Sequence, residues 1–288
     1  MQAAASRRLK LRSSALRDAS RSVGRKVWRG NGLTSGERTI PEETAVAFTY
    51  GGSSYAVMMA TPRDLEDFAL GFSITEGIVK AASGIETLEI IEEPLGVELR
   101  MWLAEPQAAA FRERRRYLAG PAGCGLCGIE SLSEAMRTPT VIADQTSVSP
   151  DDIVSAVRSL EDLQTLNTKT RAVHGAAFFR KGEGFVALRE DIGRHNALDK
   201  LAGALAHAGI PGSSGFAVLT SRLSVELVQK AAAIGIPVLV AISAPTALAV
   251  RTAEAAGVTL VAVARHDGFE VFTHPQRIFQ ERSAHVPA

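Results

Sequence analysis

The sequence predicts an α/β protein in which a smaller N-terminal α+β domain precedes a C-terminal α/β domain. The second half alternates continuous apolar runs with amphipathic segments, the pattern of buried parallel strands joined by covering helices. The first half instead shows two pairs of strand-like segments that flank a helical pattern. With 288 residues, 46% of them hydrophobic, the chain is long enough to bury two cores.

Residues 1–36 are rich in arginine and poor in acid, and we interpret them as a disordered basic tail. Nine Lys or Arg side chains precede Gly30, against a single acid, Asp18. An organelle transit peptide has the same composition, but a solvated tail is the simpler interpretation. No continuous apolar segment follows, so the sequence predicts neither a secretory signal nor a membrane span. The net charge of +1 gives no overall attraction to nucleic acid or to membranes.

The predicted N-terminal domain covers residues 37–140. Thr61 is placed to cap its first helix, with Pro62 at the first helical position and Gly77 at the end. The other elements are strands at 44–50, 55–60, 87–92 and 97–103 and a charged helix around residues 112–116.

The predicted C-terminal domain covers residues 141–278 and is followed by a tail at 279–288. It begins near Pro150, where an amphipathic helix starts, and Asp191 is expected to open a second helix after a hairpin. The later segments are strands at 216–219, 238–242, 259–264 and 269–273 and helices at 224–234 and 246–256. This order predicts a βαβαβ unit with right-handed crossovers, to which the last strand adds an edge.

The two cysteines, Cys124 and Cys127, lie in a glycine-rich loop. The loop precedes a predicted helix at residues 129–137, whose N-terminal N–H groups favour a negatively charged sulfur and therefore a reactive thiolate. Its glycines allow a large partner to approach closely. Two cysteines three positions apart, without a secretion signal, indicate redox, metal or sulfur chemistry in a reducing cytoplasm.

Spacing alone leaves several interpretations of this C-x-x-C motif open. A zinc site needs four ligands, and the chain has neither a second C-x-x-C nor an H-x-x-x-H, so we expect no bound metal. A thioredoxin-like redox centre would place the motif directly after a strand at the start of a βαβ unit. Structural cysteines would be enclosed in apolar sequence. Sulfur transfer is the fourth interpretation, and the motif by itself does not establish it.

Three loops are expected at one edge of the parallel sheet, where they could bind an anion. Each leaves the carboxyl end of a strand and carries hydroxyl or cationic groups that suit phosphate. Helix caps and turns would account equally well for single residues among them. The candidates are Ser221, Arg222 and Ser224 in the first loop, Ser243 and Thr246 in the second, and Arg265, His266, Asp267 and Gly268 in the third.

A polar stripe is predicted on the helix that Asp191 opens. Asp191, His195 and Asp199 lie at i, i+4 and i+8, with Arg194 and Lys200 adjacent. The stripe is either an ion-paired surface or a face that contacts a ligand or a second subunit. A further cluster that could line the same cleft consists of Lys169, Thr170, Arg171 and His174.

Six segments together make the sequence recognisable. They are Gly123-Cys-Gly-Leu-Cys-Gly128, Thr168-Lys-Thr-Arg-Ala-Val-His174, Glu190-Asp-Ile-Gly-Arg-His-Asn-Ala-Leu-Asp-Lys200, Ser221-Arg-Leu-Ser-Val-Glu-Leu227, Ser243-Ala-Pro-Thr246 and Thr273-His-Pro-Gln-Arg277. In these segments the chain closely resembles the FdhD family, the formate dehydrogenase accessory sulfurtransferases. The resemblance runs from about Glu37 to about Arg277.

The resemblance implies a C-terminal domain that is similar to cytidine deaminase but lacks deaminase chemistry. The residues agree, because no histidine is followed two places later by glutamate and Cys124 is preceded by glycine, whereas a zinc deaminase needs H-x-E and P-C-x-x-C. Similarity of fold would therefore mislead about function.

The resemblance also implies a function. The protein would take sulfur from a cysteine desulfurase as a persulfide on Cys124 and pass it to the molybdenum or tungsten bis-molybdopterin guanine dinucleotide cofactor before formate dehydrogenase receives that cofactor. Members of the family are homodimers. Their guanine-dinucleotide segment corresponds to Val263, Ala264, Arg265, His266, Asp267 and Gly268. Two other functions stay open: a cofactor-binding chaperone that moves no sulfur, and a dithiol redox enzyme that uses Cys124 and Cys127.

Overall fold

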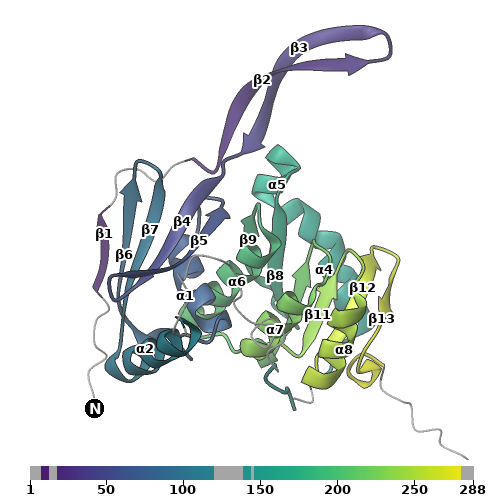
Figure 1. Cartoon of the computed structure of the whole chain (residues 1–288). Coiled ribbons are helices and arrows are strands. Elements are labelled where there is room, and N and C mark those ends of the chain that lie inside the picture. Colours follow the sequence, from purple (N-terminus) through teal and green to yellow (C-terminus); the bar gives the residue numbers. More distant parts are fainter. Residues whose placement is uncertain (1–7, 13–17, 120–138, 144–145, 280–288) are drawn as a thin grey trace, which may run out of the picture.

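Two sheets, each with its own hydrophobic core, form the body of the protein (Figure 1). The computed structural model describes residues 8–12, 18–119, 139–143 and 146–279. The N-terminal sheet has the strand order β1-β6-β7-β4-β5, and the C-terminal sheet has the order β13-β12-β11-β10-β8-β9. The mixed α/β class predicted from the sequence is confirmed, whereas the domain boundaries stay a prediction.

The N-terminal sheet packs on α1 and α2 through an aromatic core. Phe48 stacks on Phe72 at a centroid distance of 4.1 Å and meets Phe68 edge-on at 4.9 Å. These rings exclude water from the sheet face, so burial of aromatic surface stabilises this half. Its elements are β4 (Thr44–Tyr50), β5 (Ser53–Ala60), α1 (Leu65–Thr75), η1 (Ala82–Gly84), β6 (Ile85–Glu93), β7 (Gly96–Leu103) and α2 (Glu105–Ala119).

The C-terminal sheet contains the predicted βαβαβ unit. β10 (Phe216–Leu219), β11 (Val238–Ala241) and β12 (Thr259–Arg265) are parallel neighbours, and every residue of β10 and β11 is buried. The antiparallel neighbours are β8 (His174–Arg180) next to β10, β9 (Gly184–Asp191) next to β8, and β13 (Gly268–Val271) at the far edge. The helical elements are α4 (Pro150–Leu163), α5 (Thr165–Thr170), α6 (Arg194–Ala208), η2 (Gly212–Ser214), α7 (Val225–Ala233), α8 (Ala247–Ala256) and η3 (Pro275–Arg277). Within the described ranges, no helix is both long and apolar enough to cross a membrane.

The basic N-terminal segment departs from the prediction of a disordered tail. β1 (Arg8–Arg12) pairs in parallel with β6, and β2 (Ser20–Arg29) forms an antiparallel hairpin with β3 (Gly32–Pro41). The hairpin turns at two residues, the first of which, Gly30, has a φ of 58°. A Gly-Asn pair between two runs of similar length is a hairpin signal. The sequence prediction followed the arginine-rich composition of residues 1–36 and not this hairpin signal, and it was wrong for residues 20–36.

Two helix starts also differ from the prediction. Thr61 does not cap α1, which begins at Leu65 after Asp64 in a left-handed conformation. Asp191 ends β9 and does not open α6, because α6 begins at Arg194. The predicted C-x-x-C loop and the helix after it lie outside the described residues.

Two glycines bring α1 and α6 into backbone contact, which joins the two halves of the protein. A Cβ atom added at Gly71 would lie 1.7 Å from the carbonyl oxygen of Asp199, and one added at Gly203 would lie 1.9 Å from that of Asp67. No side chain fits at either position, so the helices cross at the closest separation that glycine allows. α6 also covers the C-terminal sheet, and this crossing therefore sets the position of one half against the other.

We expect the substitution Gly203→Ala to lower the free energy of unfolding by at least about 1–3 kcal/mol, because the new methyl group overpacks the α1–α6 crossing. Urea denaturation followed by circular dichroism measures the change. The control is Gly36→Ala, where an added Cβ meets nothing within 4 Å. Equal midpoints for both variants would contradict the tight crossing.

Candidate functional site

The predicted loops at the carboxyl ends of β10 and β11 are hydrogen-bonded to each other at one edge of the C-terminal sheet, the upper edge in Figure 1. The backbone N–H of Leu223 donates to Ala244 O at 3.3 Å, and that of Thr246 donates to Leu223 O at 2.9 Å. Strand β12 itself contacts the second loop, because the N–H of Val263 donates to Ser243 O at 3.3 Å. The structure therefore brings the first two predicted loops together, and the turn at 265–268 lies at the end of the neighbouring strand β12.

The third loop differs from the other two because no helix follows it. Residues 265–268 form the turn between β12 and β13. Helices follow only the other two parallel strands: α7 begins after β10, and α8 begins after β11. Thr246 caps α8, since its hydroxyl accepts from Ala249 N at 3.2 Å. Ser224 precedes α7 without a side-chain cap bond and keeps its hydroxyl for other contacts, among them one to His195.

Strain marks the end of β12. Val263 has a φ of 50°, a conformation that a β-branched residue rarely adopts, and the strand register shifts between Ala262 and Arg265. Such strain costs of order 1–3 kcal/mol and is concentrated at functional sites. The guanidinium Nη1 of Arg265 donates to the carbonyl oxygens of Ile242 and Ala264, so it is held along the sheet edge. Ala264 is buried and could offer a ligand only its backbone.

The N-terminus of α6 adds a second polar group to this edge. His195 Nε2 lies 3.5 Å from Ser224 Oγ and 4.0 Å from a carboxylate oxygen of Glu226. Burial, followed by the charge of Arg194, lowers the pKa of His195 to about 4. Burial and Arg194 also lower the pKa of His174, at the start of β8. Both imidazoles are therefore neutral at pH 7.

Arg194 has the features expected of an anion-binding cation. Its Nε is buried, and the described part of the chain offers that atom no hydrogen-bond partner. The cap residue of α6, Gly193, provides no side chain for the first N–H groups of the helix. A partly buried cation beside helix N–H groups favours phosphate or another anion. Exposed Arg222 lies in the adjacent loop and adds charge, while Ser221 is buried and donates to a backbone carbonyl.

Asp191 belongs to the support of this site and not to a surface stripe. Its carboxylate accepts from Lys200 Nζ at 2.6 Å, and both side chains are fully buried. It also accepts from the backbone N–H of Thr61 at 3.0 Å and of Gly193 at 2.8 Å. The predicted i, i+4, i+8 stripe is wrong because Asp191 lies in β9. The oxygens of Asp191 are therefore already bonded, and its bond to the N–H of Gly193 orients the start of α6.

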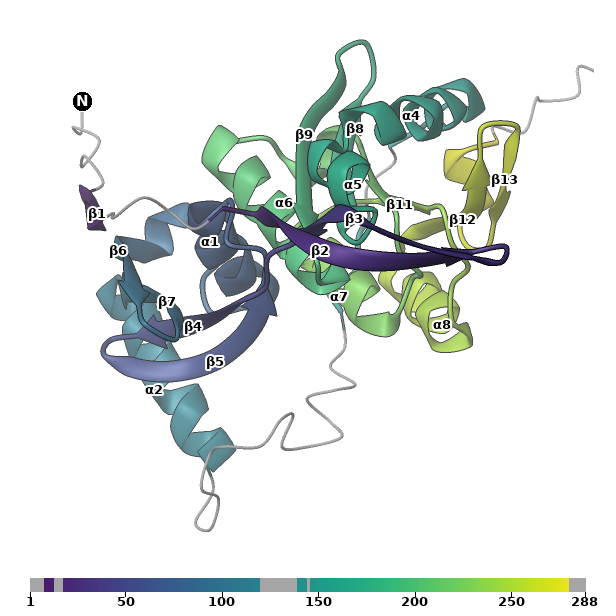
Figure 2. The same ribbon diagram turned by 90° about the horizontal axis from the view of Figure 1, so that it is seen from above.

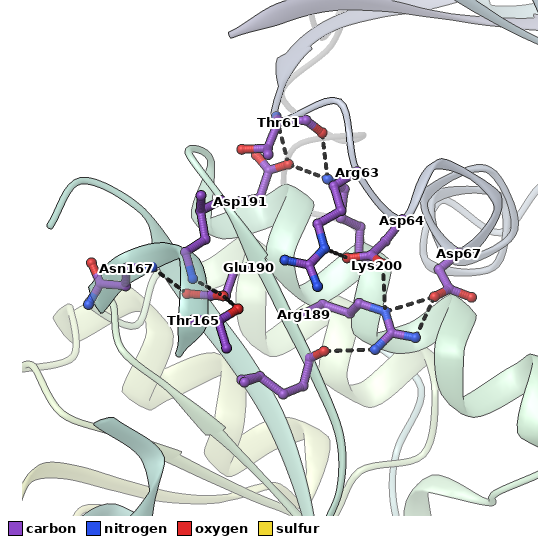
Figure 3. Close-up of polar contacts among 12 residues, drawn as sticks. Thr61, Arg63, Asp64, Asp67, Thr165, Asn167, Arg189, Glu190, Asp191 and Lys200 are labelled. Atoms are coloured by element: carbon purple, nitrogen blue, oxygen red, sulfur yellow. Dashed lines mark hydrogen bonds and ion pairs between the residues drawn. The ribbon is translucent and has the colours of Figure 1, made fainter. Parts of the chain in front are cut away.

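The last residues of β9 connect three helices (Figure 3). Arg189 forms a salt bridge with Asp67 of α1 at 2.6 Å. Burial raises the pKa of Asp67, but hydrogen bonds from His207 and Arg189 outweigh burial and hold the pKa below its ordinary value. Glu190 accepts from the N–H groups of Leu166 and Asn167 in α5, each at 2.8 Å.

A second buried cation holds α7 against α1 and α6. Lys230 Nζ donates to Asp199 at 2.9 Å and to Glu76 at 2.8 Å. Burial lowers the pKa of Lys230, but attraction to Asp199 and Glu76 exceeds that effect and raises it. The sequence interpretation missed the roles of Lys200 and Lys230. Their available signal was a lysine inside an otherwise apolar helix segment.

The remaining candidates are placed as follows. Asp267 is exposed at the β12–β13 turn, and the carbonyl of His266, also exposed, accepts from Arg158 Nε at 2.8 Å. Cys124 and Cys127 lie outside the described residues. In the part that the structure does describe, no group of three or more His, Cys, Asp or Glu side chains could hold a metal ion.

The fold and this edge define a class: an α/β protein with two large sheets, in which hydroxyl and cationic side chains gather at the carboxyl ends of parallel strands. Residues 41–279 match the FdhD/NarQ family, so the chain belongs to that family. The chain is 56% identical over 259 residues to a protein of Agrobacterium fabrum, covering 90% of this chain and 96% of the relative. It is 52% identical over 262 residues to a protein of Brucella abortus, covering 91% and 97%. Both relatives are named sulfur carrier protein FdhD.

A solved structure agrees with this assignment. The crystal structure of a protein from Desulfotalea psychrophila, described as a formate dehydrogenase accessory protein, superposes with a TM-score of 0.70 at 26% sequence identity. The superposition covers 91% of this chain and all of the other. The family expected from the sequence motifs is confirmed.

We expect the imidazole of His195 to stay neutral until the pH falls to about 4, as NMR titration of the ring would measure. The unfolded chain protonates this residue near its ordinary pKa of 6.5. Between pH 6.5 and 4 the unfolded state therefore binds more protons, and the contribution of His195 to stability falls as the pH falls. The variant His195→Gln should show a shallower loss of stability over that range. A titration midpoint at or above 6.5 would contradict the assigned environment.

Proposed function

We propose that this protein is a sulfurtransferase that carries sulfur as a persulfide on Cys124. It takes the sulfur from a cysteine desulfurase and passes it to the molybdenum or tungsten bis-molybdopterin guanine dinucleotide cofactor, its substrate, on which formate dehydrogenase activity depends. The observation that carries the proposal is the identity of more than half over 90% of the chain to a relative named as a sulfur carrier. The motif Cys124-Gly-Leu-Cys127 supplies the thiols that such a carrier needs.

The loading step is a thiol exchange. The Cys124 thiolate attacks the outer sulfur of the donor persulfide, a new S–S bond forms, and the old S–S bond breaks as the donor thiolate leaves. No net oxidation occurs, because one persulfide replaces another. Cys127, three positions away, is placed to hold or release the product.

The sheet edge supports binding of the substrate's phosphates. Arg194 is the first residue of α6, and the Nη1 group of Arg265 donates to the carbonyl oxygens of Ile242, after β11, and of Ala264. We propose that the guanine dinucleotide lies along this edge and over the strained end of β12. Near-neutral charge of the whole chain is compatible with such a local site.

The proposal has further parts that rest on family membership. They are a homodimer, a cytoplasmic location, and a division into an N-terminal domain at 37–140 and a C-terminal, cytidine-deaminase-like domain at 141–278. A chaperone that binds the cofactor without moving sulfur is the alternative that the sheet edge alone would equally support. A dithiol redox enzyme would instead cycle through a Cys124–Cys127 disulfide during turnover.

We expect Cys124→Ala to abolish persulfide formation and activation of formate dehydrogenase. Intact mass spectrometry after incubation with a cysteine desulfurase and cysteine should show one added sulfur atom on the wild type and none on the variant. Cys127→Ala, as the matched control, should still gain sulfur. Normal activation of formate dehydrogenase by both variants would favour the chaperone.

We expect Arg265→Ala to weaken guanine nucleotide binding about tenfold to a hundredfold, because it removes a charge-assisted contact of roughly 1.5–3 kcal/mol. Calorimetry with GDP measures the change, and persulfide formation at Cys124 should survive. Lys181→Ala is the control, since Lys181 is exposed in the β8–β9 turn at the opposite end of the sheet. Equal affinities for all three proteins would remove Arg265 from the site.

A further inference from the structure

The β2–β3 hairpin, residues 20–41, projects from the body as a two-stranded arm (Figure 1). None of its residues is buried. At its base, Arg38 Nη2 donates to Thr170 O of α5 at 3.2 Å, and Glu42 N donates to Ala19 O at 2.9 Å. The family match begins at residue 41, where β3 ends, so the arm lies outside the matched region.

An isolated two-stranded hairpin is at best marginally stable in water. Such hairpins usually gain stability by packing on a third strand, a helix or another molecule. Along its length this arm pairs ten residues of β2 with ten of β3, and most of their side chains are exposed. A binding partner would supply the missing contacts along its length.

The arm is strongly cationic. Residues 20–41 contain five basic side chains against one acid, Glu37, whereas the whole chain has a net charge of only +1. The remainder of the chain is therefore acidic overall. The strand register places Arg21, Arg25, Arg29 and Arg38 on one face of the ribbon, and Glu37 is on the other. A positive face without carboxylates fits an acidic surface.

The tip of the arm carries an exposed apolar pair. Trp28 and Leu33 are cross-strand partners with 67% and 61% of their surface exposed. Tryptophan and arginine are the side chains that most often dominate the binding energy of protein interfaces. The register places the pair on the face opposite to the four arginines, so a partner that contacts both would hold the arm in a groove, with an apolar pocket on one side and acidic side chains on the other.

The arm overhangs the candidate site. Figure 1 shows it above the upper edge of the C-terminal sheet, and Figure 2, seen from above, shows it crossing over α5 towards β12 and β13. That edge holds the loops to which the proposed function assigns the anionic substrate. A protein that takes cargo from this edge would come within reach of the arm.

We propose that the arm is a docking element for the protein that receives the cargo, which holds the arm in a groove with acidic side chains against the arginine face and a pocket for Trp28 on the other face. This inference rests on the proposed function. The exposed Trp28–Leu33 pair favours a protein over nucleic acid, because binding to phosphates would use only the arginines and would leave the apolar pair without a contact. The position over the site favours the recipient over a second copy of this chain.

The probe is the purified apoprotein of the formate dehydrogenase encoded in the same genome, with its binding to the full chain followed by biolayer interferometry. We expect Arg25→Glu/Arg29→Glu and, separately, Trp28→Ala to weaken binding at least tenfold. Binding of the wild type should fall as salt rises, and the charge variant should lose that dependence. The matched control is Lys80→Glu/Lys181→Glu, two exposed lysines away from the arm, which should bind as the wild type does.

Several outcomes would overturn the proposal. In the binding measurement, these are wild-type affinity in both arm variants, equal weakening in the control, or no binding of the apoprotein by the wild type. In sedimentation, it is that the arm variants lose self-association and nothing else. In a binding measurement with duplex DNA, it is that the arm binds DNA and not the apoprotein. Persulfide loading of Cys124 should be normal in all variants. Absence of loading in the wild type would instead refute the proposed function.

Discussion

The buried ion pair between Asp191 and Lys200 is the interaction on which the arrangement of the site depends. Removing two charges from water costs several kcal/mol for each, and a buried pair persists only when its other hydrogen-bonding groups are satisfied. Here the backbone N–H of Thr61 donates to Asp191, and Lys200 donates to the carbonyl of the same residue at 2.8 Å. The pair therefore fastens the segment before α1 to the end of β9 and to the middle of α6.

The second buried cation extends this arrangement to α7. Lys230 bonds to Asp199, the neighbour of Lys200 in α6, and to Glu76 at the end of α1. Because α1 crosses α6 through Gly71 and Gly203, two charged contacts and one backbone contact fix the same three helices. The N-termini of α6 and α7 are where we propose that the anionic substrate binds, so the junction between the halves supports the proposed site.

This arrangement separates the two chemical tasks of the proposed carrier. Anion binding uses rigid groups at a sheet edge, where a strained Val263 and an oriented Arg265 need no reorganisation on binding. The sulfur-carrying motif lies in the sequence between α2 and α4, in the connection between the two halves. The third task that we propose, recognition of another protein by the cationic arm, lies on the same side of the molecule.

The sequence by itself determined the βαβαβ unit and the family, because continuous apolar runs, turn residues and the six motif segments are local patterns. It misplaced Thr61 as a helix cap and Asp191 as the start of a helix, since their roles depend on each other across 130 positions. The sequence also predicted disorder where the arm forms, because the number of charged residues in a segment does not show whether that segment pairs as a strand. Only the tertiary structure decided which charged side chains are buried, since burial depends on which distant segments pack together.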